Sequence, residues 1–344
     1  MNWIAMNNIE RKVLSYISDG LGSGGSILSI AHGMSKKYGN AYYPNIYNAV
    51  IGLEKKGVVS IIKDGKNRSV RLALDNPLSV YYIGEAESWK AADTGIDSEI
   101  AKELLSLALE FDIITICILK YREYIRIGRI EILIIVRLHG QDGRLAAALA
   151  GMESAHNSKI DPIILTPQEL SAMLEGSELN RVKELISDKS IFYNSDGFWE
   201  IFREYRIDGN YANRERFPEE LTKPQLAYNY NRFGYALYED AKSGTKITLE
   251  DTIFFMSTSE ETRIRYGAIV LLYKNSNRLN ISYLYYLFKR HDELGTLKGM
   301  LESLKDFYSP ENWPGIEMLA EAIQDKKHRI YDKNLIKKYI EQYG

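Results

Sequence analysis

Residues 9–74 constrain the fold of this chain more than any other stretch of the sequence. Apolar residues at helical spacing predict a first helix from about Ile9 to Ser18. A second helix is predicted after Ser26, whose hydroxyl can accept one of the free N–H groups at a helix start. Gly39 follows in the position that favours a helix end. The stretch therefore opens with two short amphipathic helices. The glycine-rich residues 22–26 between them are expected to be a flexible connection rather than a phosphate-binding loop.

A third helix and a hairpin complete this pattern. Pro44 suits a first helical turn, which needs no N–H donor from it, and Gly57 ends the helix. The third helix has one apolar stripe, formed by Ile46, Ala49, Val50 and Leu53. Strands Val58–Lys63 and Arg68–Leu74 flank a turn at residues 64–67, and their alternating apolar residues predict a half-buried hairpin.

The exposed face of the third helix and the hairpin hold the residue types that contact DNA. Asparagine can pair with adenine, and lysine or arginine can reach phosphate. No Arg lies on this helix face and Ile51 does, so phosphate and hairpin contacts are expected to outweigh base contacts. The candidate DNA-binding residues are Lys36, Lys37, Tyr42, Tyr43, Asn45, Tyr47, Asn48, Lys55, Lys63, Lys66, Arg68 and Arg71.

Charge is distributed unevenly along the chain. The formal net charge of all 344 residues is −2, which alone would not indicate a nucleic-acid partner. Residues 1–77 hold 10 Lys and Arg against 5 Asp and Glu, a net charge of +5, and the remainder holds 34 against 41, a net charge of −7. The positive charge is therefore concentrated in the region with the DNA-binding pattern.

Residues 9–74 resemble the winged helix-turn-helix domains of archaeal and bacterial transcription regulators. The matching text is ILSIAHGMSKKYGNAYYPNIYNAVIGLEKKGVVSIIKDGKNRSVRL. The resemblance implies that the third helix enters the major groove of double-stranded DNA and that the hairpin, or wing, contacts the backbone or minor groove. It also implies transcription regulation by a homodimer. The alternative is an interaction scaffold whose charges are only solvated.

Residues 96–205 alternate between helices and strands, after a predicted connector at Asp75–Gly95. The strands are expected at Ile113–Leu119, Ile130–Leu138, Ile160–Leu165 and Ile191–Tyr193. This order resembles the small nucleotidyltransferase domains of the DNA polymerase β type, an α/β fold with a mixed sheet. In that family a Gly-Ser turn follows the first strand, and Asp-x-Asp and a later third carboxylate hold two metal ions.

The motif positions of this family are altered here. Leu119-Lys120 stands where Gly-Ser is expected, and Arg129-Ile130-Glu131 stands where Asp-x-Asp is expected. Asp161 matches the third carboxylate. A fixed cation at a metal position predicts an inactive domain without metal or cofactor. Two alternatives remain: metal-dependent nucleotide transfer, and a vestigial nucleotide site formed by Lys120, Arg129, Glu131 and Asp161.

Residues 212–344 have mostly helical spacing. The single cysteine, Cys117, lies in an apolar run and is predicted to be a buried strand residue, so no intramolecular disulfide is expected. The longest apolar runs, such as Gly267–Tyr273, are too short to span a bilayer. A soluble cytoplasmic protein without a membrane partner is expected, and the abundant Ile, Tyr and Lys suit a thermophilic archaeal source.

The sequence thus predicts an α+β multidomain protein in three parts. Residues 1–77 are expected to form the winged helix-turn-helix domain and residues 96–205 the nucleotidyltransferase-like domain. Residues 212–344 are expected to form a helical domain. DNA binding is the activity that the residues favour.

Overall fold

The computed structural model describes residues 6–39, 41–64, 67–92, 95–120, 128–207, 217–237, 243–307, 323 and 330–343. The chain divides into two compact units. The first contains residues 1–138, 166–175 and 182–215, and the second contains residues 139–165, 176–181 and 216–344. Helices and strands in the chain confirm the predicted α+β class. The three predicted domain ranges stay predictions.

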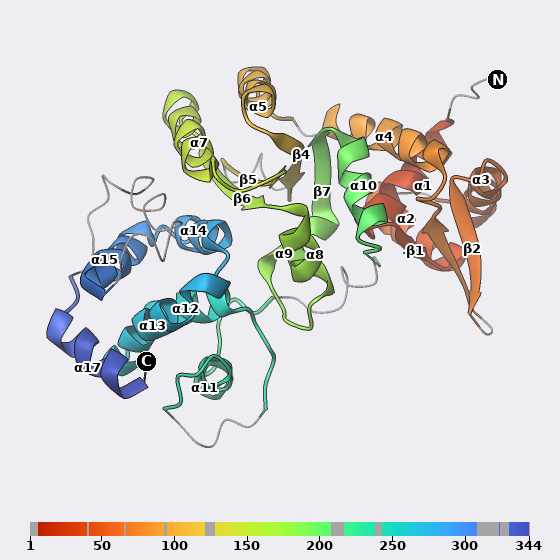
Figure 1. Cartoon of the computed structure of the whole chain (residues 1–344). Coiled ribbons are helices and arrows are strands. Elements are labelled where there is room, and N and C mark those ends of the chain that lie inside the picture. The colour runs from red at the N-terminus through yellow and green to blue at the C-terminus, as the bar shows by residue number, and fades with distance from the viewer. Residues whose placement is uncertain are drawn as a thin grey trace. The chain divides into compact units, whose positions relative to one another are not determined.

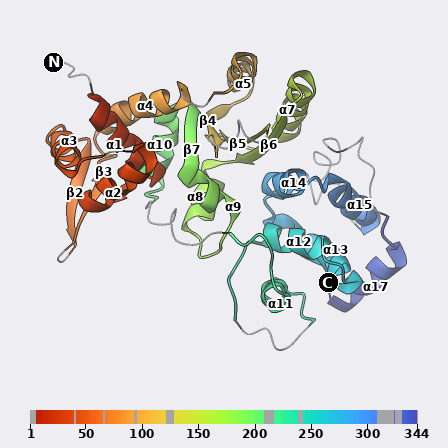
Figure 2. The ribbon, with the colours of Figure 1, turned by 180° about the vertical axis from the view of Figure 1, so that it is seen from behind.

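The first unit begins with a group of three helices and three short strands, called here the N-terminal module (residues 8–72; Figure 1). Its helices are α1 (Asn8–Asp19), α2 (Ile27–Tyr38) and α3 (Tyr43–Lys55). Its strands are β1 (Ser23–Gly25), β2 (Val59–Asp64) and β3 (Asn67–Leu72). The three helices pack on one another, and β2 and β3 form an antiparallel hairpin that projects beyond them (Figures 1 and 2).

Local signals set the ends of these helices. The Asn7 side chain accepts from the N–H groups of Ile9 and Glu10, and Glu10 accepts in return from the Asn7 N–H, so α1 opens with a capping box. Ser26 caps α2 through the N–H of Ser29. Gly39 ends α2 with a φ of 78°, which favours glycine. The predicted start of α2 after Ser26 and its end at Gly39 are confirmed, and α1 extends one residue beyond each of its predicted ends.

Strand β1 corrects one expectation. The glycine-rich residues 22–26 were predicted to be a flexible connection, but Ser23–Gly25 pairs with β3 in a sheet of order β1-β3-β2. A Cβ on Gly24 would lie 2.8 Å from the Ile30 side chain, so glycine allows the strand to approach the helices closely. A three-residue strand without apolar side chains leaves no periodic signal in the sequence.

Helix α4 (Pro77–Ala92) corrects a second expectation, because it occupies most of the predicted connector. Asn76 fixes its start: the side chain accepts from the Leu78 N–H and donates to the Gly57 carbonyl. The helix packs against α1 and also contacts α10 (Ser195–Glu204) and β7 (Lys189–Tyr193). The N-terminal module is therefore joined to the rest of the first unit through the buried face of α4.

The remainder of the first unit is built on an antiparallel group of strands. β4 (Ile113–Leu119) lies between β5 (Arg129–Val136) and β7 and pairs antiparallel with both. Cys117 is fully buried on β4, as predicted. Among its described residues, the other helices of this part are α5 (Ser98–Glu110), α8 (Pro167–Glu175) and α9 (Arg181–Leu185), with the 3-10 turn η1 (Ile186–Asp188).

The second unit is mostly helical, as predicted for its C-terminal part. Strand β6 (Lys159–Leu165) packs against α7 (Asp142–His156) and α14 (Ile281–Arg290). The other helices in the described residues of this unit are α11 (Lys223–Arg232), α12 (Leu249–Ser257), α13 (Thr262–Lys274), α15 (Leu294–Leu304) and α17 (Lys333–Tyr343), with short 3-10 turns η3 (Ser276–Arg278) and η4 (Lys305–Phe307). α12 contacts α11, α13 and α14, so it lies at the centre of this helical group.

Candidate nucleic-acid interface

The outer face of α3 is polar, aromatic and open to solvent. Its inward residues Ile46, Ala49, Val50 and Leu53 are buried, as predicted. On the other face Asn45, Asn48 and Lys55 are exposed. Tyr42, Tyr43 and Tyr47 are 69%, 44% and 43% exposed, so these rings are available to a partner. The rings of Tyr43 and Tyr47 lie 6.2 Å apart between centroids.

The hairpin carries a pair of like charges near its tip. Lys63 on β2 lies directly opposite Arg68 on β3, and both side chains are exposed. The register places this pair on the same face as the pairs Val59–Leu72 and Ile61–Val70, which reach the core of the N-terminal module. Like charges directly opposite each other destabilise a strand pair. A bound anion would remove that repulsion, so the geometry suits a phosphate contact.

The other candidate residues of this region lie in different surroundings. Lys36 is exposed in the last turn of α2. Lys37 forms an ion pair with Asp19 and is half-buried. Arg71 is half-buried on the opposite face of the hairpin from Arg68. Lys66 falls outside the described residues. Ile51 is half-buried, so the exposed surface of α3 is more polar than the sequence indicated.

The candidate nucleotide residues are divided between the two units. In the first unit, Lys120 follows β4 with a φ of 47° and its N–H donates to the Asp188 carbonyl. Glu131 lies opposite Leu119, so Lys120, Arg129 and Glu131 share one end of the β4–β5 pair. Asp161 is fully buried on β6 in the second unit. Among the described residues, no group of three or more His, Cys, Asp or Glu side chains is arranged to hold a metal ion.

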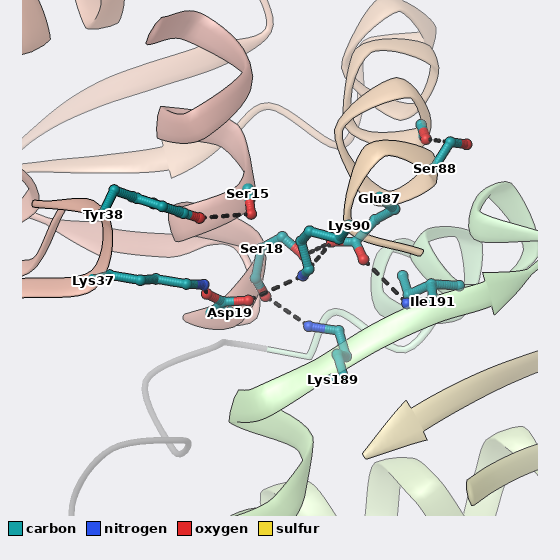
Figure 3. Close-up of polar contacts among 11 residues, drawn as sticks. Ser15, Ser18, Asp19, Lys37, Tyr38, Glu87, Ser88, Lys90, Lys189 and Ile191 are labelled. Atoms are coloured by element: carbon teal, nitrogen blue, oxygen red, sulfur yellow. Dashed lines mark hydrogen bonds and ion pairs between the residues drawn. The ribbon is translucent and has the colours of Figure 1, made fainter. Parts of the chain in front are cut away.

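The sequence did not reveal a cluster of buried charges where the N-terminal module meets α4 and β7 (Figure 3). Lys90 of α4 is fully buried and its Nζ lies 3.0 Å from Asp19 Oδ1 and 2.9 Å from Glu87 Oε1. Lys37 approaches the other carboxylate oxygen of Asp19. Burial alone would raise the pKa of Asp19, but the charges of Lys90 and Lys37 lower it below its ordinary value.

Glu87 and Lys189 connect this cluster to β7. The Glu87 carboxylate is fully buried and accepts from the Ser18 hydroxyl of α1 and from the Ile191 N–H of β7, at 3.1 Å. Lys189 donates to the Ser18 carbonyl at 2.7 Å. Burial, together with the positive charge of Lys90, lowers the pKa of Lys189 to about 8. These contacts satisfy polar groups at the end of α1 from outside the N-terminal module.

A second cluster of perturbed groups lies in the second unit. Asp251, in the first turn of α12, accepts from the Thr248 hydroxyl at 2.6 Å and from the Tyr283 hydroxyl at 3.2 Å. Burial raises the pKa of Asp251 to about 8. Burial also raises the pKa of its neighbour Glu250 to about 7, although Glu250 accepts from the Asn280 N–H. Both carboxyl groups are therefore held in a nearly dry environment within one turn of α12.

Comparison with protein-family models, with curated proteins and with solved structures gives no match in any of the three. Within the described part of the chain, no helix combines the length and the apolar character needed to cross a membrane.

Proposed function

We propose that the N-terminal module is a winged helix that binds double-stranded DNA, and that the protein is a transcription regulator. The observation that supports this most is the pairing of two exposed features. One is the polar and aromatic face of α3, and the other is the opposed Lys63–Arg68 pair on the core-facing side of the hairpin. In this arrangement α3 enters the major groove and the hairpin contacts phosphates.

The net charge of residues 1–77 supports the same proposal. A surplus of five positive charges in this region gives long-range attraction to DNA, while the remainder of the chain is acidic. The acidic remainder limits non-specific binding of DNA to other parts of the surface. The homodimer and the nucleotide ligand expected from the sequence stay predictions.

The test is a fluorescence-anisotropy titration of the full chain with a labelled duplex, repeated over a series of salt concentrations. Binding is expected to weaken as salt rises, because each neutralised phosphate releases counterions. The plot of log affinity against log salt concentration has a negative slope. In the double variant Lys63→Gln/Arg68→Gln this slope is expected to become less steep by about 2, one for each lost phosphate contact. Loss of affinity should be similar for all duplex sequences.

A matched control removes the same charge elsewhere in the first unit. Lys102 and Arg137 are 69% and 66% exposed, so Lys102→Gln/Arg137→Gln changes the net charge equally without touching the hairpin. This control should keep the wild-type slope. Absence of binding at low salt, or binding that does not respond to salt, would contradict the proposed function.

A further inference from the structure

We propose that α3 gives the protein a preference for A·T-rich duplex DNA through major-groove contacts of Asn45 and Asn48. This inference rests on the proposed DNA binding. It adds which base pairs the helix reads, a property that the winged-helix arrangement alone does not determine.

The two asparagines are placed where a recognition helix contacts base edges. They are three residues apart, so they lie on one side of α3, and both are exposed in its N-terminal half. The N-terminal residues of a recognition helix reach deepest into the major groove. The asparagine amide presents one acceptor and two donors, which match the N6 donor and N7 acceptor of adenine.

The neighbouring tyrosines favour the partner base. Tyr43 and Tyr47 are four residues apart and their rings lie 6.2 Å apart, so they form a continuous aromatic surface beside the asparagines. About half of each ring stays accessible. The only apolar group that a base presents in the major groove is the thymine methyl, which this surface can cover. The asparagine amides and the tyrosine rings are thus complementary to the two bases of one A·T pair.

Groups that read guanine are missing from this part of α3. Guanine O6 and N7 are most often bound by Arg or Lys, and the only such residue in α3 is Lys55. Lys55 lies seven residues beyond Asn48, roughly 10 Å further along the helix axis at ~1.5 Å per residue. The major groove is about 12 Å wide, so Lys55 reaches the phosphates at its edge when Asn48 contacts bases.

The inference is tested with two labelled duplexes of equal length, one with a mixed-sequence A·T core and one with a G·C core, at one salt concentration. The full chain is expected to bind the A·T duplex about tenfold or more tightly, the discrimination typical of well-formed asparagine–adenine contacts. A third duplex replaces adenine by 7-deazaadenine, which removes the N7 acceptor and leaves the minor groove unchanged. Its affinity should fall most of the way to that of the G·C duplex, and the part that remains is the contribution of the thymine methyl groups.

Two variants separate base reading from phosphate binding. Asn45→Ala/Asn48→Ala should lose most of the preference and keep the wild-type affinity for the G·C duplex, because both side chains are exposed and their removal leaves the core intact. Circular dichroism checks that this variant is folded. Lys63→Gln/Arg68→Gln should weaken binding to both duplexes equally and keep the ratio between them.

The outcomes distinguish this inference from the function on which it rests. Equal affinity for the A·T and G·C duplexes overturns the inference but leaves DNA binding in place. A preference of undiminished size in the asparagine double variant, or with 7-deazaadenine, also overturns it, because the selectivity would then come from groove shape or from the tyrosines alone. Failure to bind any duplex overturns the proposed function itself.

Discussion

The carboxylate of Glu87 holds three elements together. It is fully buried, and its oxygens accept hydrogen bonds from Ser18 of α1, from Lys90 of its own helix and from the Ile191 N–H of β7. Water does not reach this point, so no solvent molecule can replace Glu87 as the acceptor for these donors. Lys90 alone among the three has a second carboxylate partner, Asp19. The same charge raises the pKa of Lys90, which burial alone would lower.

Replacing Glu87 by alanine should therefore be costly. The variant leaves the buried ammonium of Lys90 with only Asp19 as a counter-charge, and it leaves the Ile191 N–H without its acceptor. Removal of one partner of a buried ion pair typically lowers the free energy of unfolding by about 3–5 kcal/mol. Urea denaturation measures the change.

Glu99 offers a control for this variant on the neighbouring α5. It also pairs with a lysine three residues away, but it is 62% exposed. Glu99→Ala should change the free energy of unfolding by no more than about 0.5 kcal/mol. Similar losses for both variants would show that the Glu87 cluster does not hold the first unit together.

At the scale of elements, the sequence predicted those segments whose buried face is apolar. The bounds of β4 agree with the prediction, and α1, α2, α3 and the hairpin lie within a few residues of theirs. Helix α4 was missed because its buried positions include Ser79, Glu87 and Lys90 among apolar residues. Such residues are ordinarily exposed to solvent. A prediction from hydrophobic spacing therefore assigns them to the protein surface and detects no apolar stripe in this helix.

The candidate interface was more predictable than the buried cluster for the same reason. Exposed residues such as Asn48 and Lys63 are simply the positions left over when the apolar stripe of a helix or strand is assigned. The cluster joins Asp19, Glu87 and Lys189, which are far apart in the chain. No local pattern links them, and only the packing of α4 brings them together.

Close packing of α1 and α2 yields a prediction for two helical glycines. A Cβ at Gly33 of α2 would overlap the Tyr16 hydroxyl, whereas a Cβ at Gly151 of α7 would meet nothing within 4 Å. Gly33→Ala should lower the free energy of unfolding by about 1–3 kcal/mol through overpacking. Gly151→Ala should raise it by about 0.5–1 kcal/mol, since alanine restricts the unfolded chain.

Thermal or urea unfolding of the two variants tests this difference in sign. The pair is matched, because each substitution adds one methyl group within a helix. A stabilising Gly33→Ala would mean that the Tyr16 side chain moves aside at little cost.

At the scale of the whole molecule, one buried group in each unit couples stability to pH, and the two couplings have opposite signs. The pKa of Asp251 is about 8 in the folded second unit and 3.8 as its ordinary value. Between these pH values the folded state retains a proton that the unfolded state has released, so the free energy of unfolding falls as pH rises. In the first unit the pKa of Lys189 is lowered from 10.5 to about 8. Between these pH values the unfolded state keeps a proton that the folded state has released, so the contribution of Lys189 to the free energy of unfolding rises with pH.

Hydrogen exchange followed by mass spectrometry, corrected for the pH dependence of the chemical exchange rate, can follow each unit separately. Protection of α12 and α14 should fall between pH 6 and pH 8, by at most about tenfold per pH unit for each group. Asp251→Asn should remove most of this fall, with a remainder from Glu250, whose pKa is about 7. Asp306, 60% exposed in the same unit, provides a control: Asp306→Asn should leave the fall unchanged.

The end of α1 also has a consequence for engineering. Transplanting residues 8–72 into another protein would include the Ser18 carbonyl and the Asp19 carboxylate. It would not include their partners Lys189 and Lys90. The transplanted module would then keep the Leu21 N–H and Lys37 as partners of these groups but lose both buried lysines. A chimera is better made by exchanging only the exposed residues of α3, because their replacement leaves the seam with α4 and β7 intact.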